Sequence, residues 1–160
     1  MPTNLATTYL GLALPHPLMS GASPLVNDLD TVRRLEDAGA AAIVMHSLFE
    51  EQIVAEEMAA VDHIESHARS FPEALSFFPG IEAFALGPEE YLEHIRRIRA
   101  AVAIPVIASL NGASLGGWLD FARWMEEAGA DALELNVYSL ATDPEESAAE
   151  VERRILDMLR

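Results

Sequence analysis

Four polar side chains gather at the end of a short apolar segment in the last third of the chain. Residues 132–135 are largely apolar and follow Gly129, and this length and flank favour a buried strand over a helix. The polar residues at or just beyond its end are Glu134, Asn136, Tyr138 and Ser139. Enzymes built from parallel β/α units carry their chemistry at the carboxyl ends of strands. The segment is therefore predicted to form the edge of an active site.

Two titratable side chains lie on predicted strands. His46 closes the apolar segment 40–45 and is expected to point at the same edge, either as a hydrogen-bonded structural group or as a catalyst. Glu134 lies between Leu133 and Leu135, so it faces the opposite side of its strand. If that side is the interior, the carboxylate needs a partner. Two arginines are candidates: Arg99 and Arg123.

Two loops of small residues follow predicted strands. The first is Gly21-Ala22-Ser23, after a short strand predicted at 18–20. The second covers residues 111–114, after a strand predicted at 105–110. Small residues let a ligand approach backbone N–H groups closely, although they also form ordinary tight turns. Neither loop has the three glycines of a dinucleotide-binding turn.

The composition excludes several classes of function. The formal net charge is −16, which argues against binding a nucleic-acid backbone. The chain has no lysine, which excludes a Schiff-base mechanism and a P-loop, and no cysteine, which excludes disulfides. It contains no apolar run of the roughly 20 residues that span a bilayer and no basic residue before Arg33. We therefore predict a cytoplasmic protein without a membrane segment.

Other reactive side chains lack the neighbours that their chemistry needs. His63 and His67 are four residues apart, but acidic residues surround them as on a solvated face, so no metal site is predicted. Ser139 lacks the Gly-x-Ser-x-Gly context of an activated nucleophile. A covalent hydrolase is therefore not expected.

Strands and helices alternate along most of the chain. A short hairpin over 9–14 is followed by the four strands already named, with helices predicted at 28–38, 50–69, 88–101, 115–128 and 144–159. The first of these helices is expected to be capped by Asp28 or by Asp30. This order predicts the α/β class with a parallel (β/α) barrel of the TIM type. Only four β/α units are present, whereas a closed barrel has eight. Residues 1–160 are thus expected to be a single domain, the N-terminal half of a barrel.

Several stretches in order resemble the dihydroorotate dehydrogenase family of FMN-dependent β/α-barrel oxidoreductases, especially its dihydroorotate dehydrogenase-like branch. They are residues 8–12 (TYLGL), 17–18 (PL), 21–24 (GASP), 47–53 (SLFEEQI), 107–112 (IASLNG) and 133–139 (LELNVYS). The resemblance implies an oxidoreductase that binds FMN and a small-molecule substrate and acts on CH–CH groups.

The resemblance also implies roles for individual residues. Gly21, Ala22 and Ser23 correspond to the loop that lies against the flavin. Ser109 and Asn136 correspond to side chains that touch FMN or the substrate, and Ser139 corresponds to the catalytic base. His46 stands where the family has a flavin-contacting lysine, so it is the implied flavin contact here.

The chain also departs from the family pattern. Leu140-Ala141 replaces the Pro-Asn that follows the base in the pyrimidine enzymes, which argues against orotate as the substrate. A half-barrel leaves open strand edges, so we expect self-association or pairing with a second half-barrel. Two alternatives remain: a non-catalytic half-barrel that serves as an oligomeric interaction module, and a flavin-free lyase that uses His46 and Ser139.

Overall fold

The computed structural model describes residues 4–49, 87–112, 119–137 and 142–158. The elements are β1 (Thr7–Tyr9), β2 (Leu12–Leu14), the 3₁₀ helix η1 (Pro24–Asn27), α1 (Leu29–Asp37), β3 (Ile43–Phe49), α3 (Pro88–Ala101), β4 (Val106–Gly112), α4 (Leu119–Glu127), β5 (Ala132–Val137) and α5 (Ala148–Met158). The predicted helix at 50–69 and the histidines His63 and His67 lie outside the described residues.

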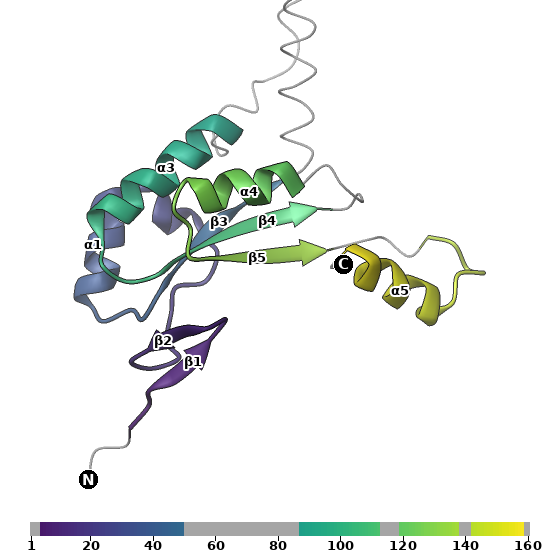
Figure 1. Cartoon of the computed structure of the whole chain (residues 1–160), viewed down its shortest axis with the longest axis horizontal. Coiled ribbons are helices and arrows are strands. Elements are labelled where there is room, and N and C mark those ends of the chain that lie inside the picture. The colour runs from purple at the N-terminus through teal and green to yellow at the C-terminus, as the bar shows by residue number, and fades with distance from the viewer. Residues whose placement is uncertain (1–3, 50–86, 113–118, 138–141, 159–160) are drawn as a thin grey trace, which may run out of the picture.

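The described part is α/β, with a parallel sheet in the order β3–β4–β5 and an antiparallel β1–β2 hairpin (Figure 1). The predicted class and the parallel direction of the strands are confirmed. The three strands form an open sheet in this part of the chain, and no closed barrel is seen there. No helix among the described residues has the length and apolar character needed to cross a membrane.

The strands are shifted relative to the predicted ranges. β3 begins at Ile43 and continues to Phe49, beyond the predicted end, and β4 includes Asn111 and Gly112, which were expected in a loop. Residues 18–20 are not a regular strand, although Leu18 O accepts from Ala41 N at 2.8 Å. Polar residues were taken as the ends of strands, but here the ladder continues through them.

The main core lies between the sheet and helices α1, α3 and α4, which cover one face of it (Figure 1). α3 occupies the predicted residues because Tyr91, Ile95 and Ile98 recur at helical spacing, and all three side chains are fully buried. They pack against the alternate strand residues that face the helices, such as Leu48 and Leu110. The other set of strand residues therefore points away from the helices.

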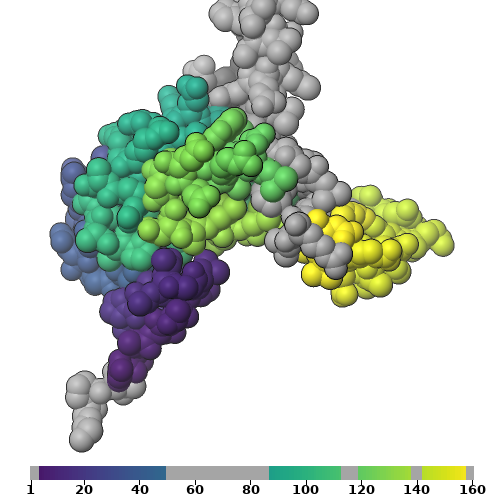
Figure 2. Space-filling model, viewed as in Figure 1, coloured from purple at the N-terminus to yellow at the C-terminus, as the bar shows by residue number. Residues whose placement is uncertain are grey.

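A second, smaller core forms on the opposite face near the start of the strands. Val44, Ile107 and Ala132 occupy neighbouring ladder positions, and Leu14 and Leu12 of the hairpin pack with them. Figure 2 shows the hairpin, in purple, against the lower side of the body. The hairpin thus covers the amino end of this face.

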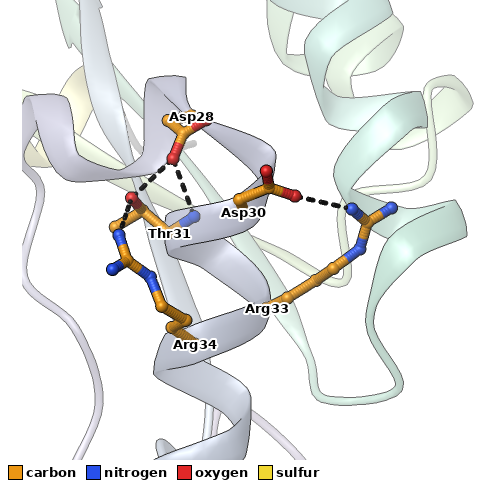
Figure 3. Close-up of polar contacts among 5 residues, drawn as sticks. All are labelled: Asp28, Asp30, Thr31, Arg33 and Arg34. Carbon is orange, nitrogen blue, oxygen red and sulfur yellow. Dashed lines mark hydrogen bonds and ion pairs between the residues drawn. The ribbon is translucent and has the colours of Figure 1, made fainter.

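The start of α1 shows how local signals set a helix boundary (Figure 3). Asp28, rather than the alternative Asp30, is the N-cap: its carboxylate accepts from Thr31 N at 2.8 Å and from Thr31 Oγ1 at 2.6 Å. These hydrogen bonds lower the pKa of Asp28. Arg33 pairs with Asp30 at 3.0 Å on the exposed side.

A glycine follows the C-terminal end of both α1 and α4. Gly39 has φ of +91° and Gly129 has φ of +102°, so each takes the left-handed position after its helix. In contrast, α5 begins at Ala148 rather than Pro144. The Glu150 carboxylate reaches back to this start: Ser147 N and Oγ both donate to Glu150 Oε2 at 2.8 and 2.7 Å.

Candidate functional site

A row of polar side chains crosses the sheet on the face that points away from the helices. Ser47, Ser109 and Glu134 occupy matching positions on β3, β4 and β5. Ser47 Oγ lies 2.8 Å from Ser109 Oγ, and Ser109 Oγ lies 2.8 Å from Glu134 Oε1. We call these three residues and Asn136 the polar row. It lies one ladder step beyond the apolar layer that the hairpin covers.

The direction of the hydrogen bonds in the polar row follows from its chemistry. A carboxylate only accepts, so the Ser109 hydroxyl donates its single proton to Glu134. Ser109 Oγ must then accept from Ser47. Asn136 Nδ2 lies 3.3 Å from Glu134 Oε1 and 3.4 Å from Ser109 Oγ, so it donates to the same pair. The row is therefore a connected chain of donors that ends on one carboxylate.

An irregularity in β3 places this row. Between Val44 and Ser47 the strand advances three residues while β4 advances two, from Ile107 to Ser109, so β3 carries a bulge at Met45–His46. Bulges interrupt the backbone ladder and change the direction of side chains, and they recur beside active sites. The bulge is what brings Ser47 level with Ser109.

The hydroxyl of Tyr91, from α3, fills the gap in the ladder. Its oxygen accepts from Ser109 N at 3.0 Å, and its proton faces His46 O at 2.9 Å and Ser109 O at 3.1 Å. Burial raises the pKa of Tyr91 far above its usual value, and the charge of Glu134 adds to this rise. Tyr91 therefore keeps its proton and replaces the missing backbone hydrogen bond.

His46 lies in the bulge and is half-buried. Its ring meets the Tyr91 ring edge-on, with centroids 5.1 Å apart, and its Nδ1 atom is buried without a hydrogen-bond partner. Burial lowers the pKa of His46, and the nearby His94 lowers it further. The neutral ring is therefore favoured. His94 itself has a structural role, because its Nε2 donates to Val26 O at 2.7 Å.

One more polar atom at this end of the sheet is buried without a partner. Asn111 lies between Phe49 and Asn136 in the ladder, one step beyond Ser109 on the same face. Its Oδ1 atom is buried and accepts no hydrogen bond. Buried acceptors in native proteins are normally satisfied, so this atom points to a missing donor.

The predicted site residues are only partly brought together. Ser109 and Asn136 lie in the polar row. His46 is linked to the row by the Tyr91 hydroxyl, which bonds both His46 O and Ser109 N. Gly21, Ala22 and Ser23 follow a segment that pairs with the start of β3: Ser20 N donates to Ala42 O at 3.3 Å, and Ser20 Oγ accepts from Val44 N at 3.1 Å. Ser139 lies outside the described residues.

Some residues of the site were missed or assigned the wrong partner. Glu134 does face away from its leucine neighbours, as predicted, but its partners are Ser109 and Asn136 rather than an arginine. The two proposed arginines pair elsewhere, Arg99 with Asp131 at 3.1 Å and Arg123 with Asp120 at 3.9 Å. Ser47 and Tyr91 were not singled out, and Asn111 was expected only as the first residue of a loop. Asn111 lies two residues after Ser109 on the same face, a signal that could have found it. Ser47 lies three residues after its same-face neighbour Val44 because of the bulge, so the period of two could not have found it.

The implied cofactor, FMN, can be tested against these side chains. The flavin ring presents carbonyl oxygens and one ring N–H along its polar edge. The unpartnered Oδ1 of Asn111 is an acceptor that such an N–H would satisfy. The side chains therefore fit the ring. The phosphate needs other donors, because the chain has no lysine. No cluster of potential metal ligands occurs among the residues that the structure describes.

The fold and the polar row define an α/β protein with a candidate ligand site at the carboxyl ends of parallel strands. No protein-family model matches the chain. It is 29% identical over 136 residues to the NAD-dependent dihydropyrimidine dehydrogenase subunit PreA of Escherichia coli (strain K12), and the aligned region covers 83% of this chain and 32% of the relative. It is also 30% identical over 135 residues to the catalytic subunit of dihydroorotate dehydrogenase B (NAD(+)) of Thermoplasma acidophilum, and this aligned region covers 84% of this chain and 41% of the relative.

These similarities relate the chain distantly to dehydrogenases whose names specify dihydropyrimidine and dihydroorotate substrates. They agree with the resemblance read from the ordered motifs. The chain spans less than half the length of either relative. The activity of a whole enzyme therefore comes to this chain only as a proposal.

Proposed function

We propose that the protein contributes the first half of the active site of an FMN-dependent oxidoreductase that acts on CH–CH groups, as in the dihydroorotate dehydrogenase family. The observation that carries this proposal is the polar row, with Ser47, Ser109 and Glu134 level across three parallel strands. In this proposal residues 1–160 form one domain, the N-terminal half of a (β/α)₈ barrel. The distant similarity to two dehydrogenases supports it.

Each predicted contact has a separate task in this proposal. Ser109 and Asn136 orient the polar edge of the flavin or the substrate, and Glu134 holds both of them in place. His46, as a neutral ring, offers a hydrogen bond rather than the permanent charge of a lysine. Gly21, Ala22 and Ser23 form the loop against the ring. Their small size allows close approach, and Gly21 has open space where a Cβ would stand.

The chemistry of the reaction is divided between cofactor and protein. Bound FMN supplies hydride transfer, which protein side chains cannot perform. The chain supplies orientation of the reacting carbon, and Ser139 is the proposed base that removes a proton from the carbon next to a carbonyl. A serine hydroxyl needs a neighbouring group to activate it as a base, and in this proposal the complete active site supplies that group.

The proposal requires a further source of phosphate contacts. The chain carries ten Lys and Arg residues against 26 Asp and Glu residues, and all ten are arginine. A phosphate held next to such an excess of acids needs backbone N–H groups or a basic partner. We therefore propose a second half-barrel or a second copy of the chain as the partner that completes the site.

An FMN titration tests the proposed function. Purified chain is titrated with FMN alone and after addition of the separately expressed C-terminal half of a homologous enzyme, and flavin fluorescence and visible absorption are followed. We expect binding in the mixture, weakened about tenfold by Ser109→Ala or Asn136→Ala through loss of one hydrogen bond. Thr31→Ala, which removes a hydroxyl that has no contact with the polar row, is the matched control. Unchanged fluorescence in both titrations would contradict the proposal.

A second candidate function is an interaction module without catalysis. β5 is an edge of the described sheet, and α4 next to it exposes Leu119 (56%) and Trp124 (43%). Exposed apolar side chains next to a strand edge favour association. Sedimentation tests this candidate: a module associates with or without flavin, and a monomer in both conditions contradicts it.

A further inference from the structure

The first 27 residues differ from the rest of the chain in charge. They contain no Asp, Glu, Lys or Arg, whereas all 26 acidic residues and all ten arginines come from Asp28 onward. Two copies of a chain with a net charge of −16 repel one another wherever their acidic surfaces meet. The uncharged segment is therefore the part of the chain at which two copies meet with the least repulsion.

This uncharged segment also exposes apolar side chains. Tyr9 and Leu10 lie at the end of the β1–β2 hairpin, where Leu10 and Gly11 form the turn. Figure 2 shows the hairpin, in purple, projecting below the body. Exposed apolar side chains that gather in one uncharged segment are typical of a contact surface. The segment holds five of the large apolar side chains that the described structure exposes: Leu5, Tyr9, Leu10, Leu18 and Leu25.

Leu10 has a backbone conformation that leucine rarely adopts. Its φ is +51° and that of Gly11 is +80°, so both turn residues lie in the left-handed region, as in hairpin turns that favour Asn-Gly. Burial does not compensate for this conformation, because the Leu10 side chain is 57% exposed. The turn alone favours asparagine at this position. An apolar side chain at a strained and exposed position points to a contact outside the isolated chain.

The outer strand of the hairpin offers backbone groups as well. Among the strands that the structure describes, β1 pairs with β2 alone, and all three of its residues are exposed. Another strand can complete such an edge, whereas a lipid bilayer cannot satisfy its N–H and C=O groups. A second β1, antiparallel to the first, fits the edge by two-fold symmetry. The edge thus favours a protein strand as the occupant, and the absence of charge favours a second copy of this chain.

We propose that the β1–β2 hairpin, through Tyr9, Leu10 and the open edge of β1, is the surface on which two copies of the chain associate. The hairpin packs at the amino end of the sheet, whereas the polar row lies toward the carboxyl end. A dimer of this kind does not use the polar row. The proposal is therefore independent of flavin binding, and it differs from association through β5 and α4.

Sedimentation equilibrium of the purified chain tests this surface with two leucine variants. Leu10→Asn removes the apolar side chain and suits the left-handed position, so the hairpin should keep its fold. Leu156→Asn, on a leucine of α5 with nearly the same exposure (54%), is the matched control. We expect a dimer whose dissociation constant rises about tenfold in Leu10→Asn and stays unchanged in Leu156→Asn. A monomeric wild-type chain, or equal dissociation constants in wild type and Leu10→Asn, overturns the proposal.

The salt dependence of the dimer separates this contact from an ionic one. Added salt screens the repulsion between the acidic bodies, so the dimer should become tighter as NaCl is raised from about 0.05 M to about 0.5 M. Weaker association at high salt would show that paired charges hold the copies together, and it would overturn the proposal. Leu10→Asn should leave FMN affinity in the two-half mixture unchanged. Failure of FMN to bind that mixture would contradict the proposed function and not the dimer surface.

Spin labels locate the contact within the dimer. The chain has no cysteine, so one nitroxide can be attached to Thr8→Cys on β1 or, as the control, to Glu90→Cys on α3. We expect a shorter distance between the two Thr8 labels than between the two Glu90 labels. A shorter distance for Glu90, or a dimer lost in Leu119→Asn and kept in Leu10→Asn, overturns the proposal. Binding of a monomer to phosphatidylcholine vesicles that depends on Leu10 would overturn it in favour of a bilayer contact.

Discussion

The two ends of the β3–β4–β5 sheet both hold carboxylates, but they use them differently. At the amino end, Asp131 accepts from Val106 N at 2.8 Å and pairs with Arg99 at 3.1 Å. Glu36 accepts from Ala103 N at 2.7 Å at the same end. These carboxylates are bound to backbone N–H groups of the fold itself and tie the loops to the strands.

At the carboxyl end, the Glu134 carboxylate accepts from the side chains of Ser109 and Asn136. The backbone there is interrupted by a bulge that Tyr91 repairs, and polar atoms of His46 and Asn111 are left unpartnered. The amino end satisfies its own polar groups, whereas the carboxyl end does not. This division matches the separation of stability and chemistry between the two ends of β/α proteins.

The largest effect is expected from Tyr91→Phe, which tests whether the carboxyl end depends on one hydroxyl. Loss of this group leaves Ser109 N–H and His46 O without their bridge, so we expect the free energy of unfolding to fall by about 2 kcal/mol. Urea unfolding measures the change. Tyr9→Phe, on an exposed residue, is the control. Equal stability of the two variants would show that the bulge needs no bridge.

Asp131→Ala tests the opposite end of the comparison. It removes the acceptor of Val106 N–H and the partner of Arg99, so we expect a loss of about 1–2 kcal/mol in the free energy of unfolding. Asp131→Asn, which keeps an acceptor oxygen, should lose less. FMN affinity in the two-half mixture should not change. A clear loss of affinity would break the separation between the two ends.

The pH dependence of stability sharpens the role of His46. Burial lowers its pKa below the usual 6.5, so the unfolded chain binds the proton more readily. This contribution to stability is complete above about pH 6.5 and is lost as the pH falls through the lower folded-state pKa. His46→Gln should flatten this part of the pH profile in chemical unfolding. An unchanged profile would mean that the ring is solvated.

The smallest effect concerns the cap of α1, which lies outside both ends of the sheet. Hydrogen bonds from Thr31 lower the pKa of Asp28 below 3.8, so the cap contributes stability above that pH and loses it as the pH falls through the folded-state value. Asp28→Ala should lower the melting temperature slightly at neutral pH. Asp28→Asn, a good N-cap that does not titrate, should keep the melting temperature and lose the acid dependence. Equal acid dependence in wild type and Asp28→Asn would contradict this account.

Local signals along the chain were enough to predict several of the elements. The limits of α3, the left-handed glycines Gly39 and Gly129 and the β1–β2 hairpin all follow from neighbours within a few residues. The alternation of strands and helices likewise predicted a parallel sheet. The residue pattern of the last strand also predicted that Asn136 lies at its end and that Glu134 faces away from the core.

The assembly of the site depends on contacts between residues that are far apart in the chain. The partner of Glu134 is a serine 25 residues away, and the partner of that serine is 62 residues away. These pairs depend on strand register, which a single bulged residue shifts, and on a hydroxyl that reaches the sheet from α3. Local sequence patterns specify which face a side chain takes. They do not specify which residue of another strand lies opposite, because packing of the whole sheet against its helices sets that register.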